Sequence, residues 1–389
     1  MNVLFLAHSY PRFATDPVGS FVLRLAVALR DHQVQVHVLA PSAPGLPARD
    51  EFEGIVVERF RYAPARLETL AYSGTMRDQV SGSWAAKAVL GSFIGAEFWK
   101  SLRMRSRFRA DVVHAHWWFP GGLVGTWLRR WWRLPLVITM HGSDVRLAGG
   151  SGSATRLFRR VLGQANAVTT VSSWLARETA AIAPAVHPIV APMPIQSDLF
   201  HPGGSRAPDR LLFVGKLNPQ KGIEHLLRAL ALMRARPTVD VVVGVGSEPA
   251  QARALAESLG VGDQLRWFPL LPQAELAERY RTCTALVMPA VDEGLGLVAA
   301  EALLCETPVV AFASGGLTDL VRDGESGLLV PPGDVAALAR ALDDLLARPD
   351  RGAAMGSTGR TRMLNLVAPH AAAGRYAAIY RDVLSAHAA

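Results

Sequence analysis

The fold is decided by the stretch Ala285-Leu286-Val287-Met288-Pro289-Ala290-Val291-Asp292-Glu293-Gly294-Leu295-Gly296-Leu297-Val298-Ala299-Ala300-Glu301, which reads as a buried strand, a glycine loop and the start of a helix. A helix that begins at such a loop offers free backbone N–H groups and a positive dipole end to an anion. If the helix begins near Leu297, the side chain of Glu301 leans back toward its start. A diphosphate on the helix tip would let Glu301 accept two ribose hydroxyls, while Glu293 faces the group beyond the far phosphate. The pattern predicts a site for a nucleotide sugar.

The same order of strand, loop and helix recurs along the whole chain, which is typical of doubly wound α/β domains. A length of 389 residues is enough for two such domains with separate cores. We expect strands at residues 2–7, 34–40, 55–60, 111–115, 135–140, 166–171, 187–191, 211–214, 239–244, 264–268, 284–288, 308–312 and 327–330. We expect helices at residues 19–30, 85–107, 121–131, 154–164, 173–182, 222–235, 249–259, 273–281, 297–304 and 334–347.

A run of turn-forming residues at 195–204 interrupts the alternation and predicts an interdomain linker. The predicted domains are residues 1–203 and 204–368, and we expect an alanine-rich terminal helix at about 369–389 to pack back on the first. Ligands of open α/β sheets collect at the carboxyl ends of the strands. The expected architecture is therefore two Rossmann-like domains that face each other across a cleft.

Composition and charge narrow the class of protein. Half of the residues are hydrophobic, and the two cysteines, Cys283 and Cys305, lie in apolar contexts that favour buried thiols over a disulfide or metal cluster. The first residues read as a core strand rather than a secretory leader, and no apolar run is long enough to span a membrane. Residues 1–200 carry 22 Lys and Arg against 13 Asp and Glu, whereas residues 201–389 carry 19 against 20. We expect a cytoplasmic protein whose first half is basic.

Two lysines open the second domain in the run Gly215-Lys216-Leu217-Asn218-Pro219-Gln220-Lys221-Gly222. A strand ends at Gly215 and a helix begins after Gly222, so Lys216 and Lys221 could both reach a diphosphate bound at the carboxyl ends of the strands. The alternative is that both are solvated loop charges. The carboxylate segment needs cations for its anion, and this favours the functional interpretation.

These residues resemble a known family. The run 215–222, the Glu293/Glu301 pair and the segment Thr307–Ala311 with Gly315-Gly316 are similar to the retaining glycosyltransferases of family 4, which have the GT-B fold. The glycine loop at 17–22 and the segments 111–116 and 138–142 also match that family, so the resemblance covers nearly the whole chain.

The resemblance implies a role for each matching residue. The catalytic residues would be Glu293 on hydroxyls of the transferred sugar, His141 against the donor sugar, and Lys216 and Lys221 on the diphosphate leaving group. The donor-binding residues would be Gly19, Gly215, Gly296, Leu297, Val298 and Glu301. The family commonly has arginine where this chain has Lys216, and lysine lacks the bidentate guanidinium fork.

The expected reaction transfers a sugar from an NDP-sugar to a hydroxyl acceptor. Two ammonium groups and a helix N-terminus can stabilise the departing diphosphate, so we expect no essential metal and no cofactor. Retention of anomeric configuration, with a phosphate oxygen taking the acceptor's proton, is implied by the family alone. Two alternatives to a transferase remain open. One is a nucleotide-sugar 2-epimerase, which shares this fold and would act on the donor without an acceptor. The other is a catalytically silent assembly partner, which would bind no nucleotide.

Three further segments have two interpretations each. His114 and His116 either contact a ligand or are satisfied strand-end side chains. The loop 267–272 either lies against the nucleobase or belongs to the core. Gly244-Val245-Gly246 either permits close backbone approach or is an ordinary turn.

The segments 98–109 and 126–133 both combine arginine with tryptophan. Basic and aromatic helices can lie on an anionic membrane surface. The alternative is an ordinary surface helix with its aromatic residues in the core. Membrane contact would suit a lipid-linked acceptor at the inner membrane face, as in polysaccharide or glycolipid assembly. Nothing in the segments matches a nucleic-acid-binding module.

Overall fold

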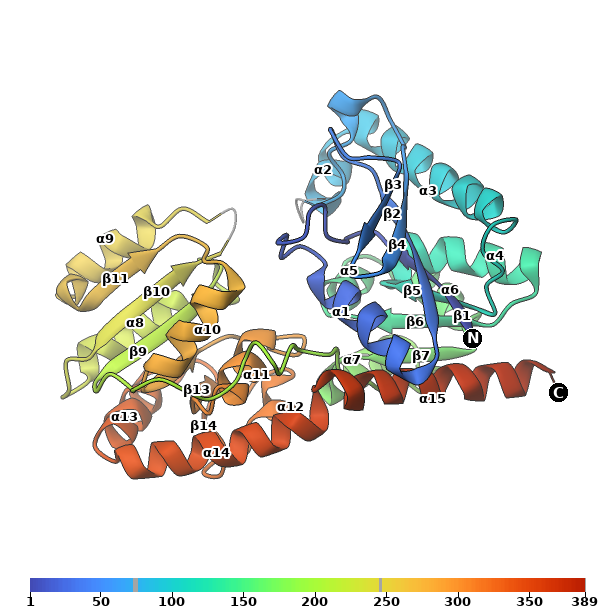
Figure 1. The fold of residues 1–389 in the computed structure, drawn as a ribbon. Helices are drawn as coiled ribbons and strands as arrows, with labels where there is room; N and C mark the ends of the chain where they lie inside the picture. The colour runs from blue at the N-terminus through green and yellow to red at the C-terminus, as the bar shows by residue number, and fades with distance from the viewer. Residues whose placement is uncertain (73–75, 245–246, 389) are drawn as a thin grey trace. The chain divides into compact units, whose positions relative to one another are not determined.

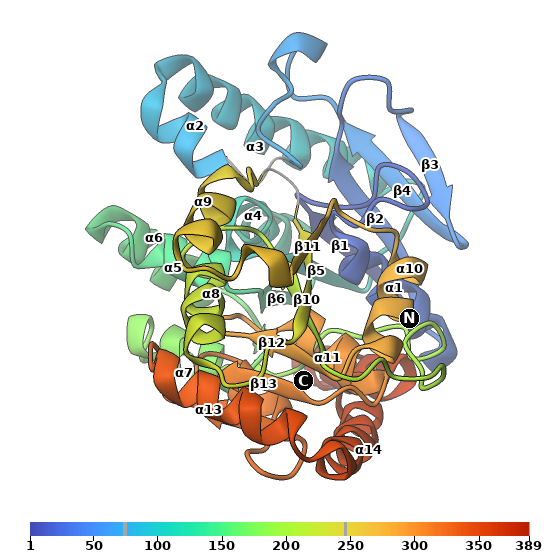
Figure 2. The same cartoon turned by 90° about the vertical axis from the view of Figure 1, so that its left-hand side faces the viewer.

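The structure is a computed structural model, and it describes residues 1–72, 76–244 and 247–388. The chain divides into two compact units, which are described separately here. Unit 1 comprises Met1–Pro194 and Pro369–Ala389, and unit 2 comprises Ile195–Ala368. Each unit is an α/β sandwich with helices on both faces of one sheet (Figures 1 and 2). The prediction of two doubly wound α/β domains is confirmed.

Unit 1 is built on an eight-stranded sheet of order β3-β4-β2-β1-β5-β6-β7-β8. All neighbouring pairs are parallel except β3 with β4. The strands are β1 (Asn2–Ala7), β2 (Gln35–Pro41), β3 (Arg49–Phe52), β4 (Ile55–Phe60), β5 (Val112–His116), β6 (Leu136–Met140), β7 (Ala167–Thr170) and β8 (Ile189–Val190). The central strands are buried along nearly their whole length, as expected for a parallel sheet covered on both faces.

The helices of unit 1 cover both faces of its sheet. They are α1 (Ser20–Leu29), α2 (Met76–Gly82), α3 (Trp84–Met104), α4 (Leu123–Trp132), α5 (Ser143–Ala148), α6 (Gly152–Leu162), α7 (Ser173–Ile182) and α15 (Pro369–Ala388). α3 packs with α4, and α1 packs with the C-terminal helix α15. α1 buries Val22, Leu25, Ala26 and Leu29 at helical spacing, so its apolar stripe faces the sheet.

Unit 2 has a six-stranded, fully parallel sheet of order β11-β10-β9-β12-β13-β14. Its strands are β9 (Arg210–Gly215), β10 (Thr238–Val243), β11 (Leu265–Phe268), β12 (Ala285–Met288), β13 (Val309–Phe312) and β14 (Gly327–Val330). Its helices are α8 (Ile223–Leu232), α9 (Ala250–Ser258), α10 (Gln273–Thr282), α11 (Leu297–Leu304), α12 (Leu317–Leu320), α13 (Val335–Leu346) and α14 (Pro349–Leu366). The strand order reverses between β9 and β12, and ligands of such sheets bind beside this point.

The boundary between the units lies before Ile195, and the prediction of a boundary after residue 203 was wrong. Residues 195–203 are irregular, but they pack on unit 2. The Ile195 amide donates to Val367 O at 2.8 Å, and buried Phe200 contacts the ring of Tyr280 at a centroid distance of 5.9 Å. The turn-forming composition therefore correctly predicted an irregular segment, but it did not show that this segment belongs to unit 2.

Five of the described helices and strands were not predicted, namely β3, α2, α5, α12 and α14. β3 was not predicted, because its residues Arg49-Asp50-Glu51 are polar; it is held as an antiparallel edge strand by β4. α14 was also not predicted, because three glycines interrupt its sequence. A Cβ on Gly356 would lie 1.7 Å from Glu306 O, so this glycine lets α14 approach the end of α11 closely.

Candidate active site

The loop between β12 and α11 forms the centre of the candidate site in unit 2. α11 begins at Leu297, as the sequence predicts, and its N-cap Gly296 has a φ of 95°. No side chain caps this helix start, and the backbone N–H groups of Leu297 and Val298 have no hydrogen-bond partner among the described residues. Unpaired N–H groups at a helix start form a site suited to an anion.

An ion pair joins this loop to the loop between β9 and α8. Lys221 Nζ lies 2.6 Å from Glu293 Oε2, and both side chains are largely buried. The Asn218 side chain accepts a hydrogen bond from the Lys221 amide at 3.0 Å, which fixes the turn that carries the lysine. The Val291 amide donates to Gln220 O at 2.9 Å, so the two loops also share a backbone contact. The sequence brought Lys221 and Glu293 to one site but did not predict their pairing.

Glycines let three loops of unit 2 lie against one another. Gly222 has a φ of 73°, and a Cβ there would lie 1.9 Å from Pro289 O. Gly315 has a φ of 60°, and a Cβ there would lie 2.5 Å from the amide nitrogen of Glu293. The Gly316 amide donates to Glu293 O at 2.7 Å. The loop after β9 therefore lies against Pro289 and the loop after β13 against the backbone of Glu293, and Gly222 and Gly315 both need to be glycine.

Glu301 lies one turn into α11 and is half-buried. Tyr280, fully buried on α10, donates its hydroxyl hydrogen to Glu301 Oε2 at 3.0 Å. Burial raises the pKa of Glu301 to about 7, and the Tyr280 hydrogen bond opposes that rise. One carboxylate oxygen is thus engaged by the protein, while Oε1 has no hydrogen bond among the described residues. The sequence did not indicate Tyr280.

Lys216 differs from Lys221 in its surroundings. Its side chain is exposed and forms no ion pair with a described residue. Gly215 ends β9, and its Cα lies against the stem of Lys221, where a Cβ would be 3.5 Å away.

Val245 and Gly246 of the predicted glycine turn lie outside the described residues. Trp267 is half-buried beneath Arg253, whose guanidinium lies 5.1 Å from the ring centre.

In unit 1, the turn after β6 positions His141. The buried carboxylate of Asp144 accepts backbone hydrogen bonds from His141, Gly142 and Val145 at 2.8 to 3.1 Å. Burial raises the pKa of Asp144 to about 6, and these N–H groups oppose the rise. Gly142 has a φ of 121°, which the tight turn requires. The run His141-Gly142 is therefore held by a carboxylate three residues on, an interaction that the sequence analysis missed.

Three neighbouring histidines lie at the carboxyl ends of β1, β5 and β6. His141 Nε2 lies 3.2 Å from His116 Nδ1, and the His141 ring also contacts Trp117, which in turn contacts His8. Burial lowers the pKa of His8 to about 4 and holds the pKa values of His116 and His141 well below the usual range. These imidazoles are neutral near pH 7, so they can form hydrogen bonds but carry no charge.

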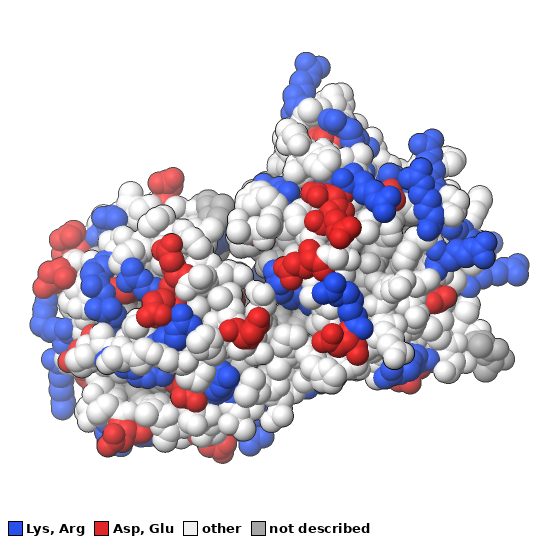
Figure 3. Space-filling model, viewed as in Figure 1, with Lys and Arg blue, Asp and Glu red and all other residues white. Residues whose placement is uncertain are grey.

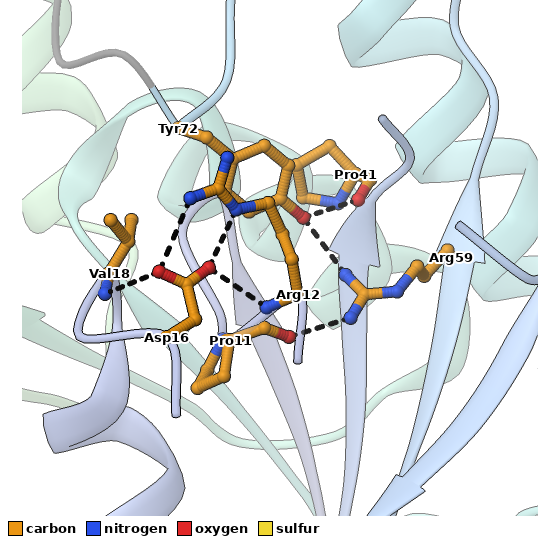
Figure 4. Close-up of polar contacts among 7 residues, drawn as sticks. All are labelled: Pro11, Arg12, Asp16, Val18, Pro41, Arg59 and Tyr72. Carbon is orange, nitrogen blue, oxygen red and sulfur yellow. Dashed lines mark hydrogen bonds and ion pairs between the residues drawn. The ribbon is translucent and has the colours of Figure 1, made fainter. Parts of the chain in front are cut away.

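The glycine loop before α1 is closed by two polar networks (Figure 4). Asp16 accepts hydrogen bonds from the amides of Arg12 and Val18, each at 3.1 Å, and pairs with the Arg12 guanidinium at 2.6 Å. Buried Arg59 donates to Pro11 O at 2.7 Å and to the Tyr72 hydroxyl at 3.0 Å.

Gly19 ends this loop with a φ of 72°, and a Cβ there would lie 2.5 Å from Ser9 O. The neighbouring Phe21 ring lies 5.0 Å from the ring of His141. Gly19 and His141 therefore belong to the same edge of the sheet in unit 1.

His114 has a structural role. It is fully buried, its Nδ1 lies 2.7 Å from the Tyr380 hydroxyl of α15, and its Nε2 lies 2.7 Å from Thr139 Oγ1. These contacts tie the C-terminal helix to the sheet of unit 1. Both cysteines are buried and free. The described residues contain no group of three or more His, Cys, Asp or Glu side chains arranged to hold a metal ion.

Sequence comparison identifies related proteins. Residues 18–194 match the model of the glycosyl transferase 4-like domain, and residues 200–362 match that of glycosyl transferases group 1. D-inositol 3-phosphate glycosyltransferase 1 of Catenulispora acidiphila is 34% identical over 85% of this chain and 82% of its own length. D-inositol 3-phosphate glycosyltransferase of Acidothermus cellulolyticus is 38% identical over 61% of this chain, and the match spans 59% of that relative.

Solved structures share the fold. Sucrose-phosphate synthase from Thermosynechococcus elongatus superposes with a TM-score of 0.82 at 25% identity, over 99% of both chains. Anabaena HepE in complex with UDP superposes with a TM-score of 0.75 at 18% identity, over 98% of this chain and 100% of that one. The two matching domain models and these relatives agree with the resemblance that the sequence motifs indicated. The loops of unit 2 carry those motifs. The chain belongs to the family 4-like glycosyltransferases of GT-B fold.

Proposed function

We propose that this glycosyltransferase uses a nucleoside diphosphate sugar as donor and that unit 2 binds it. One observation carries the proposal: the Lys221–Glu293 ion pair lies on the loops beside the start of α11, where the N–H groups of Leu297 and Val298 are unpaired. Two N–H groups and a helix dipole suit the distal phosphate, and Glu301 Oε1 is available to a ribose hydroxyl. UDP in the HepE complex supports uridine as the first base to test.

In the proposed reaction the bond between the sugar anomeric carbon and the diphosphate oxygen breaks, and a bond to the acceptor oxygen forms. Negative charge grows on the diphosphate, where the exposed ammonium of Lys216 and the start of α11 lower its energy. The proton of the acceptor hydroxyl passes to a diphosphate oxygen, so no side chain is needed as general base. Attack on the same face as the leaving group retains the anomeric configuration, which NMR of the product anomeric proton tests.

The roles proposed for Glu293 and His141 concern the transferred sugar. The Glu293 carboxylate accepts hydrogen bonds from sugar hydroxyls, and its backbone is held by Gly316 at 2.7 Å, so its position is fixed before the donor arrives. His141 is neutral because burial keeps its pKa well below the usual range, so it contributes a hydrogen bond and no charge. None of these steps uses a metal or a cofactor.

For the acceptor we propose a hydroxyl group carried on a lipid, as in polysaccharide or glycolipid assembly at the inner face of a membrane. The positive charge of residues 1–200 supports this class of acceptor. A second candidate is a soluble phosphorylated polyol, because the relatives named above are D-inositol 3-phosphate glycosyltransferases. Transfer assays with D-inositol 3-phosphate and with a membrane lipid extract distinguish the two.

Calorimetric titration with UDP tests the donor site. Lys216→Ala should weaken UDP binding by roughly tenfold, since one charge-assisted contact to phosphate is lost, and Lys216→Arg should restore it. Arg228→Ala, an exposed cation on α8 of the same unit, is the matched control. Failure of the wild-type chain to bind any of UDP, ADP or GDP would contradict the proposal, as would donor turnover without acceptor, which marks an epimerase.

A further inference from the structure

The segments 84–109 and 118–133 in unit 1, which contain α3 and α4, carry one sign of exposed charge. They contain nine Lys and Arg and one acidic residue, Glu97. Glu97 is fully buried and burial raises its pKa to about 8, so it is mainly protonated near pH 7. Lys100 is paired with Glu58 of β4. The remaining cations are Lys87, Arg103, Arg105, Arg107, Arg109, Arg129, Arg130 and Arg133. Figure 3 shows Lys and Arg side chains projecting at its upper right, where Figure 1 draws α3 and α4.

Exposed aromatic side chains lie among these cations. The ring of Phe98 on α3 contacts Trp99 at 6.4 Å, and it contacts Trp127 and Trp131 of α4 at 5.6 and 6.4 Å. Trp99, Trp127 and Trp131 are 65%, 42% and 69% exposed. In contrast Trp132 of the same segment is buried. We call Trp99, Trp127, Trp131 and the seven arginines the aromatic–basic face.

The two interpretations of these segments can now be compared. An ordinary surface helix would turn its tryptophans to the core, whereas here three of them form one cluster in water that spans two helices. Large exposed apolar groups gathered at one place mark interaction surfaces. Indole rings prefer the headgroup depth of a bilayer, and arginine side chains bind lipid phosphates while their stems lie along apolar surface.

The charge of the face selects the kind of partner. Eight cations that form no ion pair with a described residue, on segments without an exposed carboxylate, are complementary to a dense anionic surface, and each contributes electrostatic attraction to anionic headgroups. None of the helices in the described ranges is both long and apolar enough to cross a bilayer, so the contact would lie at the surface. The Trp cluster supplies the apolar part of such a contact.

We propose that the aromatic–basic face of α3 and α4 binds the headgroup region of anionic phospholipid membranes. The inference deepens the proposed function, on which it rests, by naming the partner: a lipid surface carrying the acceptor. Trp99, Trp127 and Trp131 enter the interface, and the arginines at the ends of α3 and α4 contact lipid phosphates. Binding is peripheral and reversible, and it weakens as salt screens the arginines.

Co-sedimentation of the full chain with vesicles tests the proposal. Vesicles of equimolar phosphatidylglycerol and phosphatidylcholine should bind the protein at low salt, and vesicles of pure phosphatidylcholine should bind it far less. Arg103→Ser with Arg130→Ser should lower binding by about fivefold for each arginine removed. Trp99→Ser with Trp131→Ser should lower it at least as much and should also diminish the blue shift of tryptophan fluorescence on vesicle addition, since only Trp127 of the cluster remains.

Two control variants match these changes. Arg228→Ser with Arg340→Ser removes two exposed cations from α8 and α13 of unit 2 and should leave vesicle binding unchanged. Trp84→Ser removes an indole that is 84% exposed at the other end of α3 and outside the Phe98 cluster, and its effect should be smaller. Absence of wild-type binding to the anionic vesicles, or wild-type binding by both face variants, would overturn the proposal.

A protein partner is the other occupant that the test must separate. Sedimentation of the chain alone would reveal a concentration-dependent dimer, and loss of that dimer in the Trp99→Ser/Trp131→Ser variant would assign the face to a second copy and overturn the membrane proposal. UDP titration of the same variants should be unchanged. A chain that binds vesicles but no nucleotide would contradict the proposed function and leave the membrane face intact.

Discussion

The Lys221 ammonium lies 2.6 Å from the Glu293 carboxylate, and this ion pair joins the loop before α8 to the loop before α11. The pair is largely shielded from water, so each side chain is oriented by the other in the absence of a donor. A donor that binds here meets a carboxylate already directed by a cation. The ion pair is neutral overall. Lys216, on the loop before α8, is a nearby cation that no described carboxylate engages.

We therefore expect Glu293→Ala to lower kcat by at least about a hundredfold, because hydrogen bonds to the transferred sugar are lost where charge changes most. The fold should be retained, since Glu293 lies on a loop and the ammonium of Lys221, whose side chain is 23% exposed, can be solvated when its partner is lost. Transfer assays and thermal unfolding measure the two effects. Glu325→Ala, an exposed acid of the same unit, is the control, and wild-type turnover by Glu293→Ala would exclude the proposed role.

Donor binding should depend on pH through Glu301. Its pKa rises from 4.5 to about 7 in the folded protein because of burial, whereas an ionised carboxylate is the better acceptor for ribose hydroxyls. UDP affinity is therefore expected to increase as pH rises through about 7, with release of a proton. Glu301→Gln should remove this pH dependence, together with discrimination between UDP and its 2′-deoxy analogue. Isothermal titration in buffers of different ionisation enthalpy counts the protons.

The same pKa shift affects stability with a defined sign. Between pH 4.5 and about 7 the folded state holds a proton on Glu301 that the unfolded state has released, so this residue lowers the free energy of unfolding as pH rises.

Tyr280→Phe removes a hydrogen bond that lowers the pKa of Glu301, and it should move the midpoint of UDP affinity to higher pH. An unchanged midpoint in Tyr280→Phe would show that the hydroxyl does not bind the carboxylate.

His141 should act without titrating in the working range of the enzyme. Its pKa is held well below the usual range by burial and by the neighbouring His116 and His8, so no histidine limb is expected in the pH profile of kcat near neutrality. His141→Ala should lower kcat while leaving UDP affinity unchanged. His187→Ala, an exposed histidine of the same unit, is the control. A profile with a limb near pH 6.5 that disappears in His141→Ala would contradict the neutral role.

The sequence was most informative where one local pattern determines the backbone. The alternation of apolar strands and helices predicted nearly every element of both sheets, and the glycine loop placed the start of α11 at Leu297. The family motifs brought Lys221, Glu293 and Glu301 to one edge of unit 2. Spacing along the chain could not show that Glu293 pairs with Lys221 or that Tyr280 occupies one Glu301 oxygen, because these partners come from other loops and helices.

Residues that act through buried polar contacts were missed for a related reason. Asp144 holds three backbone N–H groups of the His141 turn, and Asp16 closes the loop before Gly19, yet each is a single acid in an ordinary turn sequence. Exposure of Trp99 and Trp131 also depends on tertiary packing, since both segments contain buried aromatic residues as well. These polar contacts and side-chain exposures are set by the packing of the sheet against its neighbouring loops and helices, so the sequence alone could not predict them.

α14, for which the sequence analysis named no element, contains glycines that differ in their packing. A Cβ on Gly356 would lie 1.7 Å from Glu306 O, whereas a Cβ on Gly352 of the same helix would meet its nearest neighbour, the Leu345 side chain, at 3.5 Å. Gly356→Ala should therefore lower the free energy of unfolding by about 1–3 kcal/mol through overpacking. Gly352→Ala should raise it by about 0.5–1 kcal/mol, because alanine favours the helix and restricts the unfolded chain. Urea unfolding of the two variants provides the comparison, and equal stabilities would mean that α14 does not approach Glu306 closely.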